Sequence, residues 1–170
     1  MSLLRFLGIG KERDDAGETE TVRRIAGQLD RLPPETSKYL ACFAYVLARI
    51  ANADLDIDAS ETDAMERIVR ELASLSESEA ALVVEIAKSQ TRILGGTENY
   101  MVTREFRAVA TPDQRGRLLQ CLYAVAAADG TISTEESREI ASIGEELGFT
   151  RPEINSLRSA YRDKLAEFQG

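Results

Sequence analysis

Apolar residues recur along most of the chain at the three- and four-residue spacing of a helix that buries one face. Residues 35–52 are typical, because Leu40, Phe43 and Leu47 fall on one strongly apolar side of the helix they predict. No stretch alternates apolar and polar residues for long enough to predict a β-strand. The pattern therefore predicts an all-α protein.

Capping residues mark where the helices begin. A Ser or Thr followed three residues later by Glu forms a capping box, which satisfies free N–H groups at a helix start. Three stretches carry it: Ser76 with Glu79, Ser133 with Glu136, and Thr150 with Glu153. Asp58 and Glu61 have the same spacing, with Asp in place of Ser, and Thr111-Pro112 is an N-cap followed by a residue suited to the first turn. Together these signals predict seven or eight helices, over residues 21–31, 35–52, 58–73, 76–94, 97–110, 111–128, 133–148 and 150–168.

A short acidic stretch occurs twice, each time between two apolar helical runs. The copies are residues 53–61 and 128–136, and a shift of 75 positions superimposes them. The superimposed residues are Ala53 on Ala128, Asp54 on Asp129, Ile57 on Ile132 and Glu61 on Glu136. Self-similarity at a fixed period indicates a duplicated structural unit. We therefore expect one domain over residues 21–170, built from repeats at approximately 35–95 and 111–168 that pack with pseudo-symmetry.

The first 20 residues differ from the rest. Residues 1–10 are apolar but too short to span a membrane, and residues 11–20 are polar and resemble a linker. We expect a flexible head and linker. We expect residues 1–10 either to be a frayed or core-docked terminus or to form an amphipathic helix that contacts a membrane or a partner, with Leu3, Leu4, Phe6 and Leu7 inserted.

The charge and composition exclude several functions. The 29 acidic against 21 basic residues give a net charge of −8, which argues against nucleic-acid binding. The chain has no histidine, so triads with a histidine base and His-ligated zinc are excluded. Cys42 and Cys121 lie in apolar helical runs, and we expect both to be buried, reduced thiols. The reduced state and the lack of a signal peptide favour the cytoplasm.

The acidic loops are the candidate functional site, and an EF-hand is the first hypothesis to test. Its first, third and fifth positions are filled by Asp54, Asp56 and Asp58. Position six is Ala59, where glycine is needed, and the twelfth positions hold Met65 and Ile140 instead of a bidentate Glu. An EF-hand is therefore rejected.

Two interpretations remain open. In one, the acidic residues only cap helices and start turns, with glycine at Gly130 accepting a left-handed conformation. In the other, the two loops converge and their carboxylates hold a divalent cation, Ca²⁺ or Mg²⁺, since such cations prefer several oxygen ligands. The candidate ligands are Asp54, Glu61, Asp129 and Glu136, with Asp56 and Asp58 as additional ones. No organic cofactor is indicated.

The sequence Ala-Asp-Gly-Thr-Ile-Ser at 128–133, followed by Glu136, resembles the signature of the TerB-like family. That family includes bacterial tellurite-resistance TerB proteins and the helical part of the DjlA co-chaperones. The resemblance covers approximately residues 20–168, and the first copy departs from it with Leu55 where glycine is common. It implies an all-helical duplicated fold. By motif position it also implies a metal site at Asp54, Glu61, Asp129 and Glu136.

The resemblance further implies a stress-response role against tellurite and other agents, with membrane-linked partners. We expect a non-enzymatic protein, because no phosphate-binding loop, dinucleotide fingerprint or activated nucleophile occurs. The alternative function is a protein-interaction module that recruits a membrane-associated partner, with a location in the cytoplasm or at the inner face of the membrane. A helical enzyme that uses the paired carboxylates is the third hypothesis.

Overall fold

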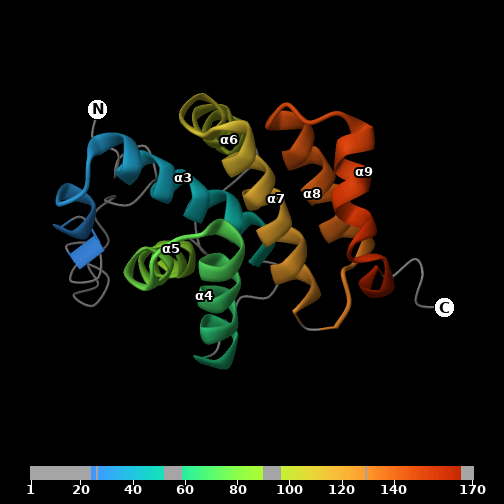
Figure 1. Ribbon diagram of the computed structural model, residues 1–170, viewed down its shortest axis with the longest axis horizontal. Coiled ribbons are helices and arrows are strands. Elements are labelled where there is room, and N and C mark those ends of the chain that lie inside the picture. The colour runs from blue at the N-terminus through green and yellow to red at the C-terminus, as the bar shows by residue number, and fades with distance from the viewer. Residues whose placement is uncertain (1–23, 26, 52–58, 90–96, 129, 166–170) are drawn as a thin grey trace.

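The computed structural model describes residues 24–25, 27–51, 59–89, 97–128 and 130–165. The elements follow the order α3 (Pro34–Ala51), α4 (Ala59–Ala73), α5 (Glu77–Ser89), α6 (Thr97–Val109), α7 (Pro112–Ala127), α8 (Thr134–Glu146), α9 (Arg151–Ser159) and a short 3₁₀ helix, η1 (Arg162–Lys164) (Figure 1). The described part of the chain contains no strand, only an isolated bridge between Ile132 and Leu165. The predicted all-α class is confirmed.

The predicted helix starts are confirmed wherever the structure describes them. Thr111, Ser133 and Thr150 each accept a hydrogen bond from the N–H three residues on, and that residue's side chain accepts one in return. Ser76 and Glu79 form the same reciprocal pair. The cap proposed for Asp58 with Glu61 lies outside the described residues. At Thr111 the partner is Gln114, so the box is more complete than the N-cap alone that we predicted.

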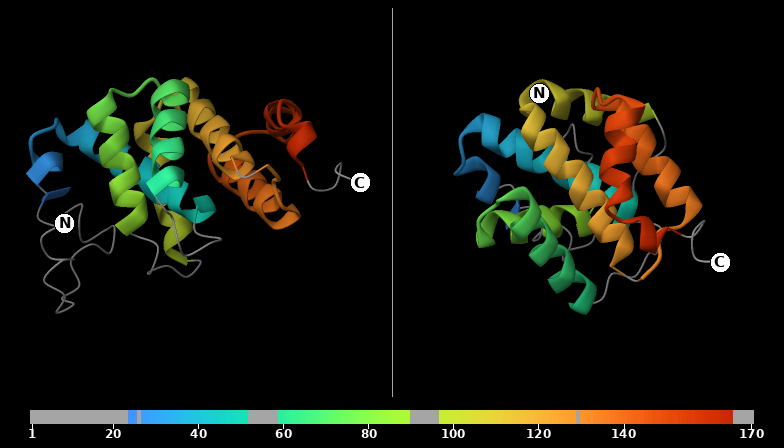
Figure 2. Two further views of the ribbon diagram at one scale, coloured as in Figure 1. Left: turned by 90° about the horizontal axis from the view of Figure 1, so that it is seen from below. Right: turned by 45° about the vertical axis from the view of Figure 1, so that its right-hand side comes forward.

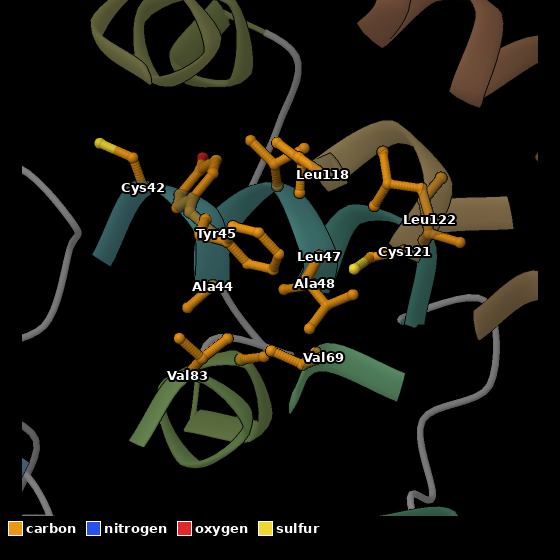
Figure 3. Packing of buried hydrophobic residues seen from close by; sticks show 14 of the residues in the cluster. Cys42, Ala44, Tyr45, Leu47, Ala48, Val69, Val83, Leu118, Cys121 and Leu122 are labelled. Atoms are coloured by element: carbon orange, nitrogen blue, oxygen red, sulfur yellow. The ribbon is translucent and has the colours of Figure 1, made fainter. Parts of the chain in front are cut away.

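Helix α3 is buried on every side over most of its length. The residues from Tyr39 to Ala48 are all buried, although we predicted only one strongly apolar face. The reason is tertiary, since α5, α6 and α7 all pack against this helix. Ala44 and Ala48 let neighbouring helices approach closely, and Val69, Val83 and Leu118 fill the space around them (Figure 3).

Helix α4 belongs to the first repeat, but it packs on α7 of the second as well as on α5. The two helices α4 and α7 run in opposite directions, as Figure 1 and the right-hand view of Figure 2 both show. The first turn of α4 and the last turn of α7 therefore lie at the same end of the molecule. The starts of α4 and α8, at Ala59 and Thr134, keep the 75-residue shift of the acidic repeat.

The last helix is shorter than predicted. We expected it to continue through Tyr161 and Leu165 to Phe168, but α9 ends at Ser159 and the chain turns through η1. The turn lets Leu165 pack beside Ile132, and the N–H of Ile132 donates to the carbonyl of Lys164 at 2.6 Å. The chain leaves the helix after Ser159, and this allows Leu165 to be buried in the core. Phe168 lies outside the described residues.

The tyrosines are more deeply placed than predicted. The positions of Tyr39, Tyr45, Tyr100 and Tyr123 in helical runs of the sequence predict residues at the edge of the core, but Tyr45 and Tyr123 are 1% and 0% exposed. Tyr45 and Tyr123 stand on α3 and α7, which pack against each other and against three further helices each. The side chain of Tyr100 lies outside the described residues.

Among the described helices, none is long and apolar enough to cross a membrane.

Candidate functional site

The structure describes one of the predicted cation ligands in full. Asp54, Asp56, Asp58 and Asp129 lie outside the described residues, and of Glu61 only the backbone, in the first turn of α4, is described. Glu136, in the first turn of α8, is described with its side chain. The geometry of the candidate site is therefore argued from Glu136 and from the helix ends that flank the two loops.

The helix ends that flank the loops lie together. The first acidic stretch leads into the start of α4, and the second follows the end of α7. Because α4 and α7 pack against each other in opposite directions, these two ends share one end of the molecule (Figure 1). A packing contact between the two repeats, rather than the repeat pattern itself, produces this arrangement.

Glu136 is the N3 residue of the capping box at the start of α8. Its backbone N–H donates to Ser133 Oγ at 3.0 Å, and its Oε1 accepts from the N–H of Ser133 at 3.4 Å. The carboxylate is half-buried. The capping box therefore orients Glu136 and uses one of its two oxygens.

The residues around the second loop are held firmly by the backbone. Gly130 has a φ of +104°, as we predicted for the turn, and its N–H donates to the carbonyl of Ala127 at 2.9 Å. Ile132 is fully buried and is bonded to Lys164. A loop fixed at both ends in this way loses little conformational entropy when it binds a ligand.

The chemistry of the side chains restricts the kind of ion that could bind. Burial raises the pKa of the thiols of both Cys42 and Cys121 to about 12. Both cysteines are free and buried, as predicted, and at neutral pH they are protonated, whereas metal binding needs the thiolate. With no histidine in the chain, the donors that remain are oxygen atoms, which suit Ca²⁺ and Mg²⁺. Within the described ranges, no group of three acidic or cysteine residues could hold a metal ion.

Sequence reasoning missed a basic pocket beside the second loop. The pocket has a volume of about 190 Å³ and lies at the start of α8, where Ser137, Arg138 and Arg158 line it. Arg158 comes from α9, and its Nε donates to Ser137 Oγ at 3.1 Å. The positive charge opposes cation binding nearby and offers carboxylates a counter-charge, so it favours the capping interpretation. Only the packing of α9 on α8 brings Arg158 here.

A second feature that the sequence did not indicate is a groove of about 560 Å³ at the opposite end of α4 and α7. Residues from α3, α5 and the end of α6 complete its walls. Because the lining residues are spread from position 35 to position 117, no local pattern could have predicted this groove.

Comparison with known proteins gives a match to a family model. A family model described as "Tellurite resistance protein TerB" matches residues 39–159, which include both repeats of the acidic stretch. No curated protein and no solved structure matches the chain.

Proposed function

From the premise that this chain belongs to the TerB family, we propose that it is a non-enzymatic stress-response protein of the tellurite-resistance type, which binds a divalent cation through its two acidic loops. The observation that carries the proposal is the antiparallel contact of α4 with α7, which brings the flanks of both loops to one end. The proposed ligands are Asp54, Glu61, Asp129 and Glu136. Asp56 and Asp58 are additional candidate ligands. Ca²⁺ or Mg²⁺ fits the oxygen donors.

The proposed mechanism is preorganisation by helix capping. Ser133 and Glu136 hold each other at the start of α8, so the Glu136 carboxylate is already oriented before an ion binds. The partial positive charge at the helix start lowers the repulsion among nearby carboxylates in the absence of the ion. A bound cation neutralises the repulsion among these carboxylates. Because only the folded state brings them together, cation binding stabilises the folded state.

The test is a thermal melt in chelator, and then in millimolar Ca²⁺, Mg²⁺ or Mn²⁺. A ligand at 100 times its dissociation constant stabilises the folded state by about 2.7 kcal/mol, which raises Tm by roughly 5–10 °C for a chain of this size. Asp129→Asn should abolish the shift. A shift that persists when both Asp54 and Asp129 are changed to Asn would contradict the proposed ligands.

Glu136→Gln separates cation binding from helix capping. A glutamine at this position keeps the capping box, as Gln114 does at the start of α7, but it removes the negative charge. The variant should therefore melt near the wild-type temperature in chelator and lose most of the cation-dependent shift. Glu153→Gln is the matched control, because Glu153 holds the same position in the box of α9, away from the acidic loops. It should keep the full shift.

A second candidate function rests on a different observation. Glu136 already serves as a cap, and Arg138 and Arg158 line a pocket with Ser133, its partner in the capping box, so the acidic loops could act only structurally. The protein would then be an interaction module that recruits a membrane-associated partner through residues 1–10. Deletion of residues 2–10 should release the protein from the membrane fraction while the melt is unchanged. An unaltered distribution would count against this role for the head.

A further inference from the structure

The groove lies at the opposite end of α4 and α7 from the start of α4 and the end of α7, and its lining residues indicate what it can bind. It is lined by the starts of α3, α5 and α7 and by the end of α4. Its volume of about 560 Å³ lies within the range of about 300–1,000 Å³ that is typical of ligand pockets. It involves none of the proposed cation ligands, so it can be tested independently of the proposed function.

The charged side chains of the groove leave an excess of negative charge. Glu35, Glu79 and Asp113 face a single base, Arg117. Asp113 accepts from Arg117 Nε at 2.8 Å, and Arg117 also donates to Ser74, so this base is already neutralised and held. Among the described residues, Glu35 and Glu79 have no ion-pair partner. The groove therefore favours a positively charged group.

The helix starts in the groove do not reverse this preference. A helix start attracts anions through its free N–H groups. Here the caps already occupy such groups, because Thr111 Oγ accepts from the N–H of Gln114 and Ser76 Oγ accepts from the N–H of Glu79. These N–H groups are therefore not available to an anion, and the carboxylates determine the charge preference of the groove.

Tyr39 supplies a polar atom that the fold itself does not use. The residue is 8% exposed, and no hydrogen bond joins its hydroxyl to another described residue. Burial raises its pKa to about 12, and the charges that act on it include those of Arg117, Glu79 and Asp113. All three line the groove, so the hydroxyl end of the ring lies there too. Tyr39 lines the groove and its hydroxyl makes no hydrogen bond within the described part of the fold, so an occupant of the groove can hydrogen-bond to it without breaking an existing contact.

Aliphatic side chains complete the lining. Ala73, Leu75 and Val109 form an apolar wall beside the carboxylates. Leu75 and Val109 remain only half-buried, although both pack on the core. An occupant that covers them needs an apolar group next to its positive one, as occurs in a polypeptide and not in a simple diamine.

We propose that this groove binds a segment of a partner protein in which a lysine or arginine lies beside an aliphatic residue. The basic group meets Glu35 and Glu79 and hydrogen-bonds to Tyr39, while the aliphatic side chain packs on Leu75 and Val109. The groove is then an interaction surface of the domain itself, distinct from both the acidic loops and the N-terminal head.

The test uses the ¹⁵N-labelled full chain and a capped tripeptide of leucine, arginine and leucine, followed by NMR. Saturable amide shifts are expected at residues 73–79 and 111–117. The same peptide with citrulline in place of arginine keeps the shape but lacks the charge, and it should bind about two- to fivefold more weakly, the loss of a single exposed ion pair. Equal binding of the two peptides, shifts confined to other regions, or no shifts at millimolar peptide would overturn the proposal.

Two variants localise the interaction. Tyr39→Phe removes only the hydroxyl and should weaken peptide binding about two- to twelvefold, the value of one hydrogen bond, while the fold is retained. Tyr123→Phe is the matched control, because it also removes a hydroxyl that has no hydrogen-bond partner, but that hydroxyl is buried outside the groove, and the change should leave binding unchanged. The exposed Glu35→Lys should abolish binding. Wild-type affinity in both Tyr39→Phe and Glu35→Lys would refute the assignment.

Discussion

Arg49 of α3 and Glu139 of α8 form an ion pair in which Arg49 Nη2 lies 2.6 Å from Glu139 Oε1. The Nε of Arg49 donates to the same oxygen at 3.0 Å, and its Nη1 donates to Glu146 Oε2 at 3.0 Å. Only 9% of the Arg49 side chain is exposed. Since Arg49 belongs to the first repeat and both acids belong to the second, one guanidinium joins the two halves of the domain.

Arg49→Met should destabilise the protein, because it leaves two carboxylates facing a partly buried space without their base. Breaking a buried ion pair costs about 3–5 kcal/mol, but solvent screening at Glu139, which is 41% exposed, reduces the expected loss to about 1–3 kcal/mol. Urea unfolding measures the change. The control is Lys38→Met, whose pair with Glu105 is exposed and should cost under about 1 kcal/mol. Equal losses would show that the Arg49 pair has no special role.

Gly144→Ala should also destabilise, against the usual effect of alanine in a helix. A Cβ at Gly144 would lie 2.9 Å from Cδ1 and 2.9 Å from Cγ1 of Ile154, where α9 packs on α8. Overpacking of this kind costs about 1–3 kcal/mol. Gly27→Ala is the control, because a Cβ there meets nothing within 4 Å, and it should stabilise by up to about 1 kcal/mol. Ile154→Ala removes the side chain that the new Cβ would meet. Thermal melts of the double variant should therefore show a smaller loss of stability than the sum of the losses in the two single variants.

Leu165→Ala should loosen the loop that carries the second acidic stretch. Leu165 is 2% exposed, and its burial holds the backbone bond from Ile132 to Lys164 in place. Truncating a buried leucine costs about 2–5 kcal/mol. Hydrogen exchange at the Ile132 amide should accelerate by at least about tenfold, the factor for 1.4 kcal/mol. The exposed Lys164→Ala keeps the backbone carbonyl and should leave this exchange rate unchanged.

Stability should fall at high pH. Burial raises the pKa of Cys42, Cys121 and Tyr39 to about 12, from ordinary values of 9.0 for the thiols and 10.0 for the phenol. The unfolded chain therefore releases these protons first, and their contribution to stability is complete below about pH 9 and is lost as the pH rises towards 12. Each group adds up to about 1.4 kcal/mol per pH unit to the slope.

Urea unfolding from about pH 8 to pH 11 measures this slope, and Cys42→Ala with Cys121→Ala should reduce it. The same burial should keep both thiols unreactive towards a thiol reagent in the native protein and release both on unfolding. Rapid labelling of the native protein, or an unfolding free energy that stays constant across this range, would contradict the burial of the thiols.

The sequence determined the helices and their starts, because these depend on local chemistry. Apolar spacing decides which face of a helix is buried, and Ser133 with Glu136 or Thr150 with Glu153 can form a capping box within one turn. The duplication and the family resemblance could also be recognised in the sequence, since a shift of 75 residues superimposes side chains of the same kind. The left-handed turn at Gly130 also follows from a single residue.

Only the tertiary structure decided which surfaces these helices create. The complete burial of α3 requires α5, α6 and α7 around it, and the early end of α9 depends on the distant contact of Leu165 with Ile132. The packing of α4 on α7 brings the flanks of the acidic loops together at one end and forms the groove around Tyr39 at the other. Contacts between residues far apart in the chain depend on the three-dimensional fit of whole helix faces, and the order of residues within one helix does not specify that fit.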